Sequence, residues 1–303
     1  MALTPAGSTE RTLDLGHGPL RVLYSVADPA PPGIPLLLVH GGGTDSAAIS
    51  WYEAYSTFGP GRPVVAPDLP GFGGSTGVAP VGGPDALADV VAGVADRLGL
   101  RRVVVGGISM GGDVALQLAL RRPDLVEALV LVAPGGLTPL LGNRALQFSS
   151  WLAAQLPDPV LVPLARIANR FARSALRRMV RNPEGLPAEV VDEFVREARR
   201  PRAGMGYARY NQATLGPRAM RNDLQPVVGR ITVPALFLHG ADDPMVDPGD
   251  SRRAAAAMPD ARLVTLPGCG HWAQFEARER VAREVQEFLA GLDRRRDTAG
   301  ARP

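Results

Sequence analysis

The sequence predicts an α/β fold with a doubly wound, mostly parallel sheet and a helical segment inserted between two strands. Three observations lead to this prediction: short aliphatic runs without alternation, amphipathic helical patterns between those runs, and a strand-free stretch over residues 134–229. Aliphatic runs without alternation are typical of strands buried on both faces, which occur in parallel sheets covered by helices. Strand and helix patterns that alternate along the chain favour the α/β class.

Five aliphatic runs are the predicted strands, and helical patterns fall between them. The strands cover residues 36–39, 62–66, 103–105, 129–132 and 235–238. The clearest helix has Leu87, Val90, Val91, Val94 and Leu98 at i, i+3, i+4, i+7 and i+11, and Gly99 suits its C-terminal cap. Val281, Val285, Phe288 and Leu289 repeat the pattern near the end of the chain.

The strand-free stretch divides the chain into a core and a predicted cap. Residues 134–229 carry helical patterns separated by proline and glycine, the clearest at Val190, Val191, Phe194, Val195 and Ala198. We therefore expect a core formed by residues 1–133 and 230–293, with a helical cap, or lid, between its two parts. The first ten residues and residues 294–303 are expected to be frayed ends, the latter an unstructured tail.

Composition excludes several classes of protein. The 303 residues include 33 basic side chains, all arginine, against 30 acids, and a net charge of +3 does not suggest a nucleic-acid or membrane-surface partner. Without lysine there is no Schiff-base or P-loop lysine chemistry. The single cysteine, Cys269, cannot form an internal disulfide, and no Cys/His spacing suits a metal. Without an apolar span or signal peptide in view, we expect a cytoplasmic protein without cofactor or metal.

A candidate nucleophile lies where the strand at 103–105 turns into a helix. The segment Gly107-Ile108-Ser109-Met110-Gly111 is a G-x-S-x-G motif with a buried strand before it and a helical pattern after it. Its glycines allow the two backbones to approach closely in a sharp turn. Such a turn holds the serine in a strained conformation, with its hydroxyl above the sheet near a helix N-terminus.

A serine nucleophile needs a base, and the chain has four histidines. His17 lies in a predicted N-terminal hairpin turn, His40 ends the 36–39 strand, and His239 ends the 235–238 strand, where a packing or hydrogen-bonding role is expected. His271 lies in a glycine-rich loop after the apolar pair Leu263-Val264 and before the last helix. A loop beyond a strand end suits a mobile proton carrier, so His271 is the candidate base.

Three carboxylates are candidates for the acid that orients the His271 imidazole. Asp242, Asp243 and Asp247 all follow the 235–238 strand, and Asp247 before Pro248 suits a turn cap. Asp243 is preferred and Asp242 stays the alternative. The order Ser109, Asp243, His271 is the nucleophile, acid, base order of one hydrolase fold.

From about Leu20 to Leu292 the chain resembles the α/β-hydrolases. The segments that carry the resemblance, besides the serine turn, are His40-Gly41-Gly42-Gly43, Asp68-Leu69-Pro70-Gly71-Phe72-Gly73-Gly74-Ser75, Gly240 with Asp243, and Gly270-His271. The resemblance implies an oxyanion hole made by the N–H groups of Met110 and Gly42, with Gly43 as the next candidate. Its G-x-x-D acid loop is the reason for preferring Asp243, and Asp68 is expected to be a structural turn residue.

Within that superfamily the chain most resembles the meta-cleavage product hydrolases, which cut C–C bonds in vinylogous diketo acids. The matching segments are His40 to Gly43, Ser109 to Gly112, Ala133 to Leu137 and Cys269 to Gln274. The resemblance implies that Gly41, Gly43 and Trp272 contact the substrate. It implies the same for Arg177, because Leu176-Arg177 followed by Asn182-Pro183 is similar to a substrate-binding segment of that group. For Trp272 the alternative is packing at the start of the last helix, and for Arg177 it is an exposed helical position.

One residue departs from that group, which usually has asparagine before the nucleophile where this chain has Ile108. The departure puts C–C specificity in question, and it leaves unchanged the general expectation of a serine hydrolase that acts on a small ester or on a C–C bond of a vinylogous diketo acid. Three alternatives remain: a cofactor-free haloperoxidase or perhydrolase, a lyase or cyclase of secondary metabolism, and a non-catalytic ligand-binding relative. The expected partner is a small-molecule substrate, and a homo-oligomer is compatible with the sequence.

The net charge of +3 is the sum of two parts of the chain that carry opposite net charges. Between Arg144 and Arg221 there are 14 arginines against 6 acids, a net of +8, and the rest has a net of −5. A basic cap would steer a carboxylate-bearing substrate toward the core. The alternative is that these arginines lie on solvated helix faces.

Overall fold

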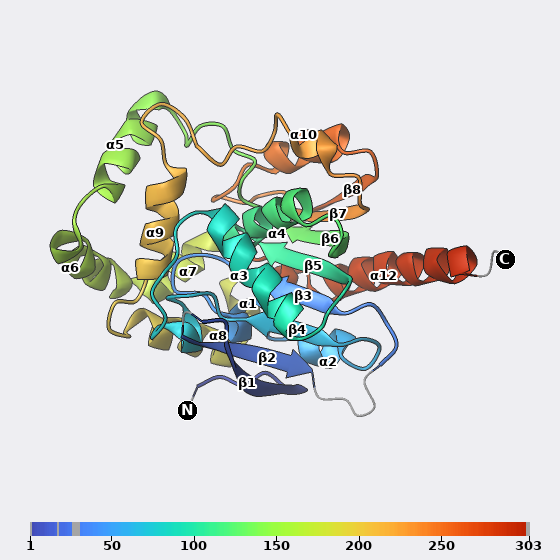
Figure 1. Cartoon of the computed structure of the whole chain (residues 1–303). Helices are drawn as coiled ribbons and strands as arrows, with labels where there is room; N and C mark the ends of the chain where they lie inside the picture. The colour runs from blue at the N-terminus through green and yellow to red at the C-terminus, as the bar shows by residue number, and fades with distance from the viewer. Residues whose placement is uncertain (1, 17, 26–30, 301–303) are drawn as a thin grey trace.

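The computed structural model describes residues 2–16, 18–25 and 31–300, and it confirms the predicted fold class. Figure 1 shows a central twisted sheet with helices around it. Its eight strands are ordered β1-β2-β4-β3-β5-β6-β7-β8. The pairs β1–β2 and β2–β4 are antiparallel, and the pairs from β4 onward are parallel. The strands are β1 Ser8–Asp14, β2 Pro19–Ser25, β3 Leu36–Val39, β4 Val64–Pro67, β5 Val103–Ile108, β6 Val126–Val132, β7 Ala235–Gly240 and β8 Ala261–Leu266.

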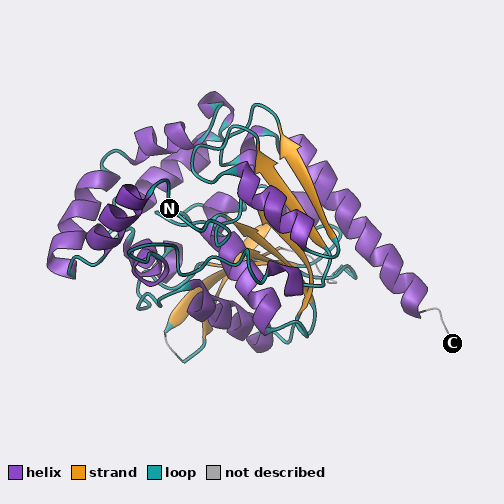
Figure 2. Ribbon diagram, turned by 90° about the horizontal axis from the view of Figure 1, so that it is seen from above, coloured by secondary structure: helices purple, strands orange, loops and turns teal. Residues whose placement is uncertain are grey.

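Helices cover both faces of the sheet, as Figure 2 shows from above. Aliphatic side chains on one face pack against α3 and α4, and those on the other face pack against α1, α11 and α12. Strands β3, β4 and β5 are buried along their whole length, which is why their sequences do not alternate. The helices outside the β6–β7 connection are α1 Ala47–Ser50, α2 Ala54–Phe58, α3 Pro84–Arg97, α4 Met110–Arg121, α10 Pro248–Ala257, α11 Ala273–Glu276 and α12 Arg278–Gly300.

Five α-helices lie between β6 and β7, and we call residues 144–214 the α5–α9 segment. They are α5 Arg144–Ala154, α6 Asp158–Asn169, α7 Ala172–Met179, α8 Ala188–Ala198 and α9 Met205–Thr214. In Figure 1, α5 and α6 stand away from the sheet, while α8 lies beside it. Leu176, Val190 and Phe194 join the core on that side, so α7 and α8 are the packed part of the segment.

The two ends of the chain differ from the sequence prediction. The predicted N-terminal hairpin is present as β1 and β2, although β1 begins at Ser8 within the expected frayed region; His17 lies outside the described residues. The expectation of an unstructured tail from residue 294 is wrong for residues 294–300, because α12 continues to Gly300. None of the described helices combines the length and apolar character needed to cross a bilayer.

Candidate active site

Ser109 occupies the sharp turn between β5 and α4. Its φ is 53° and ψ is −119°, a left-handed conformation that side chains rarely adopt, so the backbone is strained there. A Cβ at Gly107 would lie 2.2 Å from the Gly111 carbonyl oxygen, and one at Gly111 would lie 2.2 Å from the Val39 carbonyl oxygen. The glycines of the motif are therefore required by close backbone approach, as the sequence predicted.

His271 and Asp243 are brought together from the loops after β8 and β7. The distance between His271 Nδ1 and Asp243 Oδ2 is 2.7 Å. Nδ1–H donates to the carboxylate, which leaves Nε2 free to accept a proton. Among the described residues no hydrogen bond joins the Ser109 hydroxyl to His271; such contacts are often loose without substrate. Asp242, the alternative acid, is exposed and does not contact His271 through its carboxylate.

Asp243 is held as an anion by more than His271. Its side chain is fully buried, His239 Nε2 lies 3.2 Å from Oδ2, and the N–H groups of Met245 and Val246 donate to Oδ1 at 2.7 and 3.1 Å. Burial alone would raise the pKa of Asp243, but the hydrogen bonds from His239 and His271 hold that pKa well below its usual range. The sequence predicted a packing or hydrogen-bonding role for His239, but not Asp243 as its partner.

The loop that carries His271 is tied to the end of α7. The His271 N–H donates to the Met179 carbonyl oxygen at 2.8 Å. The Glu276 carboxylate accepts from the N–H groups of Gly270, Arg181 and Asn182 at 2.8, 2.6 and 3.0 Å. These contacts fix the histidine loop against the α5–α9 segment. Sequence reading missed Glu276, because a glutamate at the start of a helix resembles any exposed first-turn acid.

The glycine loop after β3 packs against Tyr207 of α9. A Cβ at Gly42 would lie 2.3 Å from the Tyr207 ring, so only glycine fits beneath it. The Gly41 N–H donates to the buried Asp45 carboxylate at 2.9 Å, and Gly43 has a φ of 74°. Among the described residues the Gly42 N–H donates to no protein acceptor. Met110 begins α4, where a first-turn N–H has no partner within the helix.

Three residues that could have competed for a catalytic role are structural. Buried Asp68 accepts from Ala47 N–H, Gly74 N–H and the Arg21 guanidinium. His40 Nε2 accepts from the Leu69 N–H at 3.0 Å, so this histidine links two loops. Asp247 caps α10 by accepting from the Gly249 N–H at 2.8 Å. The turn roles expected for Asp68 and Asp247 agree with these contacts.

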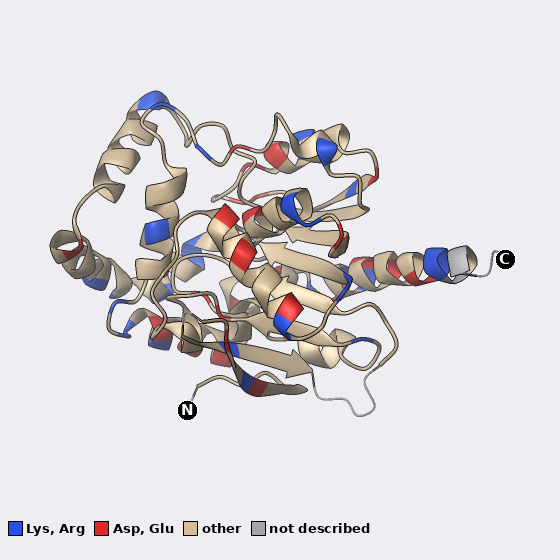
Figure 3. Cartoon of the chain, in the orientation of Figure 1, with Lys and Arg blue, Asp and Glu red and all other residues tan. Residues whose placement is uncertain are grey.

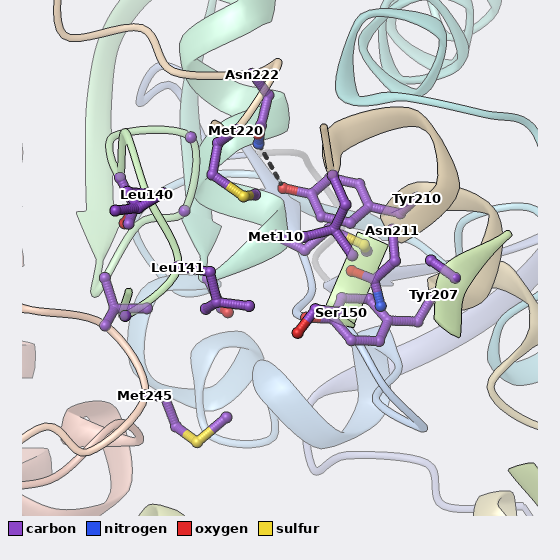
Figure 4. A pocket seen from close by; sticks show the side chains of 18 of the residues that line it. Met110, Leu140, Leu141, Ser150, Tyr207, Tyr210, Asn211, Met220, Asn222 and Met245 are labelled. Carbon is purple, nitrogen blue, oxygen red and sulfur yellow. Dashed lines mark hydrogen bonds between the residues drawn. The ribbon is translucent and has the colours of Figure 1, made fainter. Parts of the chain in front are cut away.

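A cavity of about 830 Å³ opens beside Ser109. Figure 4 shows Met110, Leu141, Tyr207 and Met245 around it, drawn from α4, α9 and the loops after β6 and β7. Helices α5 and α6 contribute Ser150, Ala153, Ala154 and Leu161. The wall is mainly apolar, and its charged members are Asp247, Asp250 and Arg253. Such a space suits an apolar small molecule.

None of the four predicted substrate contacts, Gly41, Gly43, Arg177 and Trp272, lines this cavity. Arg177 is exposed on α7, as its alternative interpretation had it. Trp272 is 2% exposed and packs edge-on against Phe194, with ring centroids 5.7 Å apart, and against Phe275. Neither residue lines the space beside Ser109. Ile108 is also buried, in the core beneath the sheet face that α1 covers.

A buried polar cluster forms part of the cavity wall. Asp113 Oδ2 accepts from the Tyr210 hydroxyl and from Asn222 Nδ2, both at 2.6 Å, and Asn222 Nδ2 also lies 3.1 Å from the Tyr210 oxygen (Figure 4). Asp113 is one helical turn after Ser109, so the cluster connects α4 to α9. Burial raises the pKa of Asp113 to about 7, although the hydrogen bonds from Tyr210 and Asn222 oppose the shift.

This shift gives a testable pH dependence of stability. The folded pKa lies above the ordinary 3.8, so the folded protein holds this proton more tightly than the unfolded chain does. The stabilisation is complete below about pH 4 and is lost as the pH rises through 7. In Asp113→Asn, whose amide oxygen can accept both hydrogen bonds, that loss disappears. The unfolding free energy of the variant relative to wild type should therefore rise by on the order of a few kcal/mol from acidic to alkaline pH.

Denaturant unfolding at several pH values checks this expectation, with Glu279→Gln as the control at an exposed carboxylate. A difference between Asp113→Asn and wild type that does not change with pH would show that Asp113 does not titrate in this range.

The chain is similar to proteins of known fold and activity. The alpha/beta hydrolase fold family matches residues 34–278. The 2-hydroxy-6-oxo-6-phenylhexa-2,4-dienoate hydrolase of Burkholderia cepacia is 30% identical over 275 residues, which cover 85% of this chain and 88% of the relative. The dihydrolipoyllysine-residue acetyltransferase component of an acetoin cleaving system of Pseudomonas putida is 31% identical over 258 residues, 85% of this chain; the chain spans 64% of that relative. A thermophilic esterase from Thermogutta terrifontis has a TM-score of 0.68 and 25% identity, covering 95% of this chain and 99% of the esterase.

Proposed function

The chain belongs to the alpha/beta hydrolase fold family, and from this premise we propose that it is a serine hydrolase with Ser109 as its nucleophile. The observation that carries the proposal is the 2.7 Å contact between His271 and Asp243, which follow β8 and β7 at the same edge of the sheet as the strained Ser109 turn after β5. A serine on such a turn, a histidine with a free Nε2 and a buried carboxylate are the parts that acyl transfer needs.

The reaction on an ester follows from these positions. His271 Nε2 takes the Ser109 proton while the serine oxygen attacks the carbonyl carbon. The Met110 and Gly42 N–H groups stabilise the oxyanion, and loss of one such donor typically costs about 3 kcal/mol of barrier. The alcohol leaves with the proton from His271, and water activated by the same imidazole then releases the acid from Ser109.

Cleavage of a C–C bond is the second candidate, favoured by the dienoate hydrolase that is 30% identical. On a vinylogous diketo acid the enol must first become a keto tautomer, so that the carbon beside the cleaved bond can leave as a stabilised carbanion. The mainly apolar cavity accommodates either substrate. Arg253, whose guanidinium pairs with Asp250, is the cationic residue of the wall that a substrate carboxylate would meet.

We include the α5–α9 segment in the proposal as a cap that selects the substrate. Helices α5, α6 and α9 supply cavity residues, and the Tyr207 ring lies directly on Gly42. A substrate that reaches the Gly42 N–H therefore has to pass or contact this ring. None of the arginines of the segment lines the cavity, so any steering by them acts at long range.

Assays on two substrate classes in ¹⁸O-labelled water test the proposal. We expect wild-type protein to hydrolyse p-nitrophenyl butyrate or a 2-hydroxy-6-oxo-6-phenylhexa-2,4-dienoate, with one labelled oxygen entering the acid product. The faster of the two substrates assigns the ester or the C–C reaction. Turnover without labelled oxygen would point to a lyase or cyclase, and turnover that requires peroxide would point to a perhydrolase. Either result would contradict the hydrolase assignment.

A further inference from the structure

Large apolar side chains are exposed along α6 and into the turn that follows it. Val160, Leu164, Ile167 and Phe171 are 42%, 50%, 52% and 65% exposed. Their spacing of i, i+4, i+7 and i+11 places them in one stripe along the helix. Phe148 and Leu152 of α5, at i and i+4, are 51% and 54% exposed. Contiguous apolar surface of this kind on a folded protein marks an interaction site.

The stripe does not belong to the cavity. Of α6, Leu161 lines the space beside Ser109, whereas Val160, Leu164 and Ile167 do not. The two helices therefore have an inner side toward the cavity and an apolar outer side toward solvent. In Figure 1, α5 and α6 are the elements at the left of the molecule that lie farthest from the sheet. No described element packs over the stripe.

Arginines flank the stripe and line a groove next to it. The groove, of about 490 Å³, lies between α6 and the connection from α8 to α9, and its wall includes Arg166, Arg170, Arg199, Arg200 and Arg202. Figure 3 shows basic residues in this region at the lower left, with acidic residues among them. Arg200 pairs with Glu197 and Arg202 with Asp158, while no described carboxylate lies within 4 Å of Arg166, Arg170 or Arg199.

We propose that the outer face of α5 and α6 docks on an anionic phospholipid bilayer. An apolar stripe flanked by arginines matches a helix that lies in the membrane interface, with its apolar side in the acyl boundary and its cations on headgroup phosphates. Arginine binds phosphate through its planar fork, and the groove offers several such forks. Docking at the surface requires no membrane-spanning helix.

A second copy of the chain fits this face less well. A two-fold interface brings the same patch of both subunits together, so the unpaired arginines of one α6 would lie opposite a patch that is itself rich in arginine. From α5 through α7 there are six arginines and one acid, Asp158, which already contacts Arg202 and Arg209. Like charges across an interface oppose association, whereas an anionic bilayer neutralises them.

Vesicle binding by the full chain tests the proposal and does not depend on catalysis, so Ser109→Ala protein serves equally. We expect sedimentation with vesicles of phosphatidylcholine containing about 30 mol% phosphatidylglycerol, weaker binding to phosphatidylcholine alone, and release by salt. Arg166→Gln/Arg170→Gln should lower the partition coefficient about 25-fold. Leu164→Ser/Ile167→Ser should lower it at least about tenfold.

The matched control is Arg294→Gln/Arg296→Gln, which removes two exposed arginines from α12 at the other side of the molecule. It should change the partition coefficient by no more than about threefold, and thermal melts should show that all variants fold. Absent binding, or equal loss in both arginine pairs, overturns the proposal. A dimer in sedimentation velocity that Leu164→Ser/Ile167→Ser dissolves, without vesicle binding, assigns the face to a second copy and also overturns it.

Discussion

Ser109→Ala is expected to lower kcat/KM by about 10⁴-fold to 10⁶-fold on every substrate that the wild-type protein accepts. Without the hydroxyl there is no oxygen to form the proposed acyl intermediate, and the proposed Met110 and Gly42 donors alone would stabilise only the direct attack of water. The cavity should still bind substrate, because the methyl group is smaller than the hydroxymethyl group it replaces. The loss should therefore appear in kcat and leave KM nearly unchanged.

Steady-state kinetics on the faster substrate measure this effect, with Ser149→Ala as the control. Ser149 is exposed on α5 and its hydroxyl donates only to the Leu146 carbonyl oxygen. A Ser109→Ala enzyme with near-wild-type turnover would remove Ser109 from the reaction.

Asp243→Asn is expected to lower kcat by about 10⁴-fold, while Asp242→Asn should change it by no more than about threefold. An asparagine at 243 can present an N–H to His271 Nδ1 at the present 2.7 Å contact. The histidine proton then moves to Nε2, and the base can no longer take the Ser109 proton. The neighbouring Asp242 is exposed and has no contact with the imidazole, so it provides a control one residue away.

The pair of variants separates the two candidate acids directly, provided that thermal melts show both proteins to be folded. A larger loss in Asp242→Asn than in Asp243→Asn would reverse the assignment. Equal and small losses in both would show that the imidazole does not need a carboxylate.

The parts of the fold that could be predicted are those whose signal lies within a short window. The strands at residues 36–39, 103–105 and 235–238 are fully buried, so each was readable as an aliphatic run. The edge strand β1, with mostly exposed side chains, carries no such signal. At the other end, the apolar pattern stops at Leu292, but arginine is a strong helix former and α12 continues without packing.

The residues of the candidate site also differ in whether a short stretch of sequence predicts them. Ser109 and His271 follow strand ends within recognisable motifs, and the predicted resemblance to meta-cleavage product hydrolases is confirmed by the relatives. The partner of His239 and the contacts of Glu276 and Tyr207 could not be found from the sequence, because these contacts form only when distant loops pack together. Arg177 and Trp272 were assigned by resemblance, and the structure places both away from the cavity.

The net charge of the whole chain does not show where the charged side chains lie. A net charge of +3 argued against a membrane surface as a partner, yet the arginines of residues 144–221 are concentrated on a segment with an exposed apolar face. A sum over the chain contains no information about which side chains share a surface. The proposed docking face depends on the positions of Arg166 and Arg170 beside the α6 stripe.

Labelling with a fluorophosphonate probe tests the central claim most directly, because the probe reacts with a serine only when a base activates its hydroxyl. The account predicts one adduct in the intact mass of the wild-type protein, located on Ser109 by peptide mapping. The adduct should be absent from Ser109→Ala and should form far more slowly in His271→Ala. No adduct on folded wild-type protein, or an adduct that persists in Ser109→Ala, would contradict the assignment of Ser109 as an activated nucleophile.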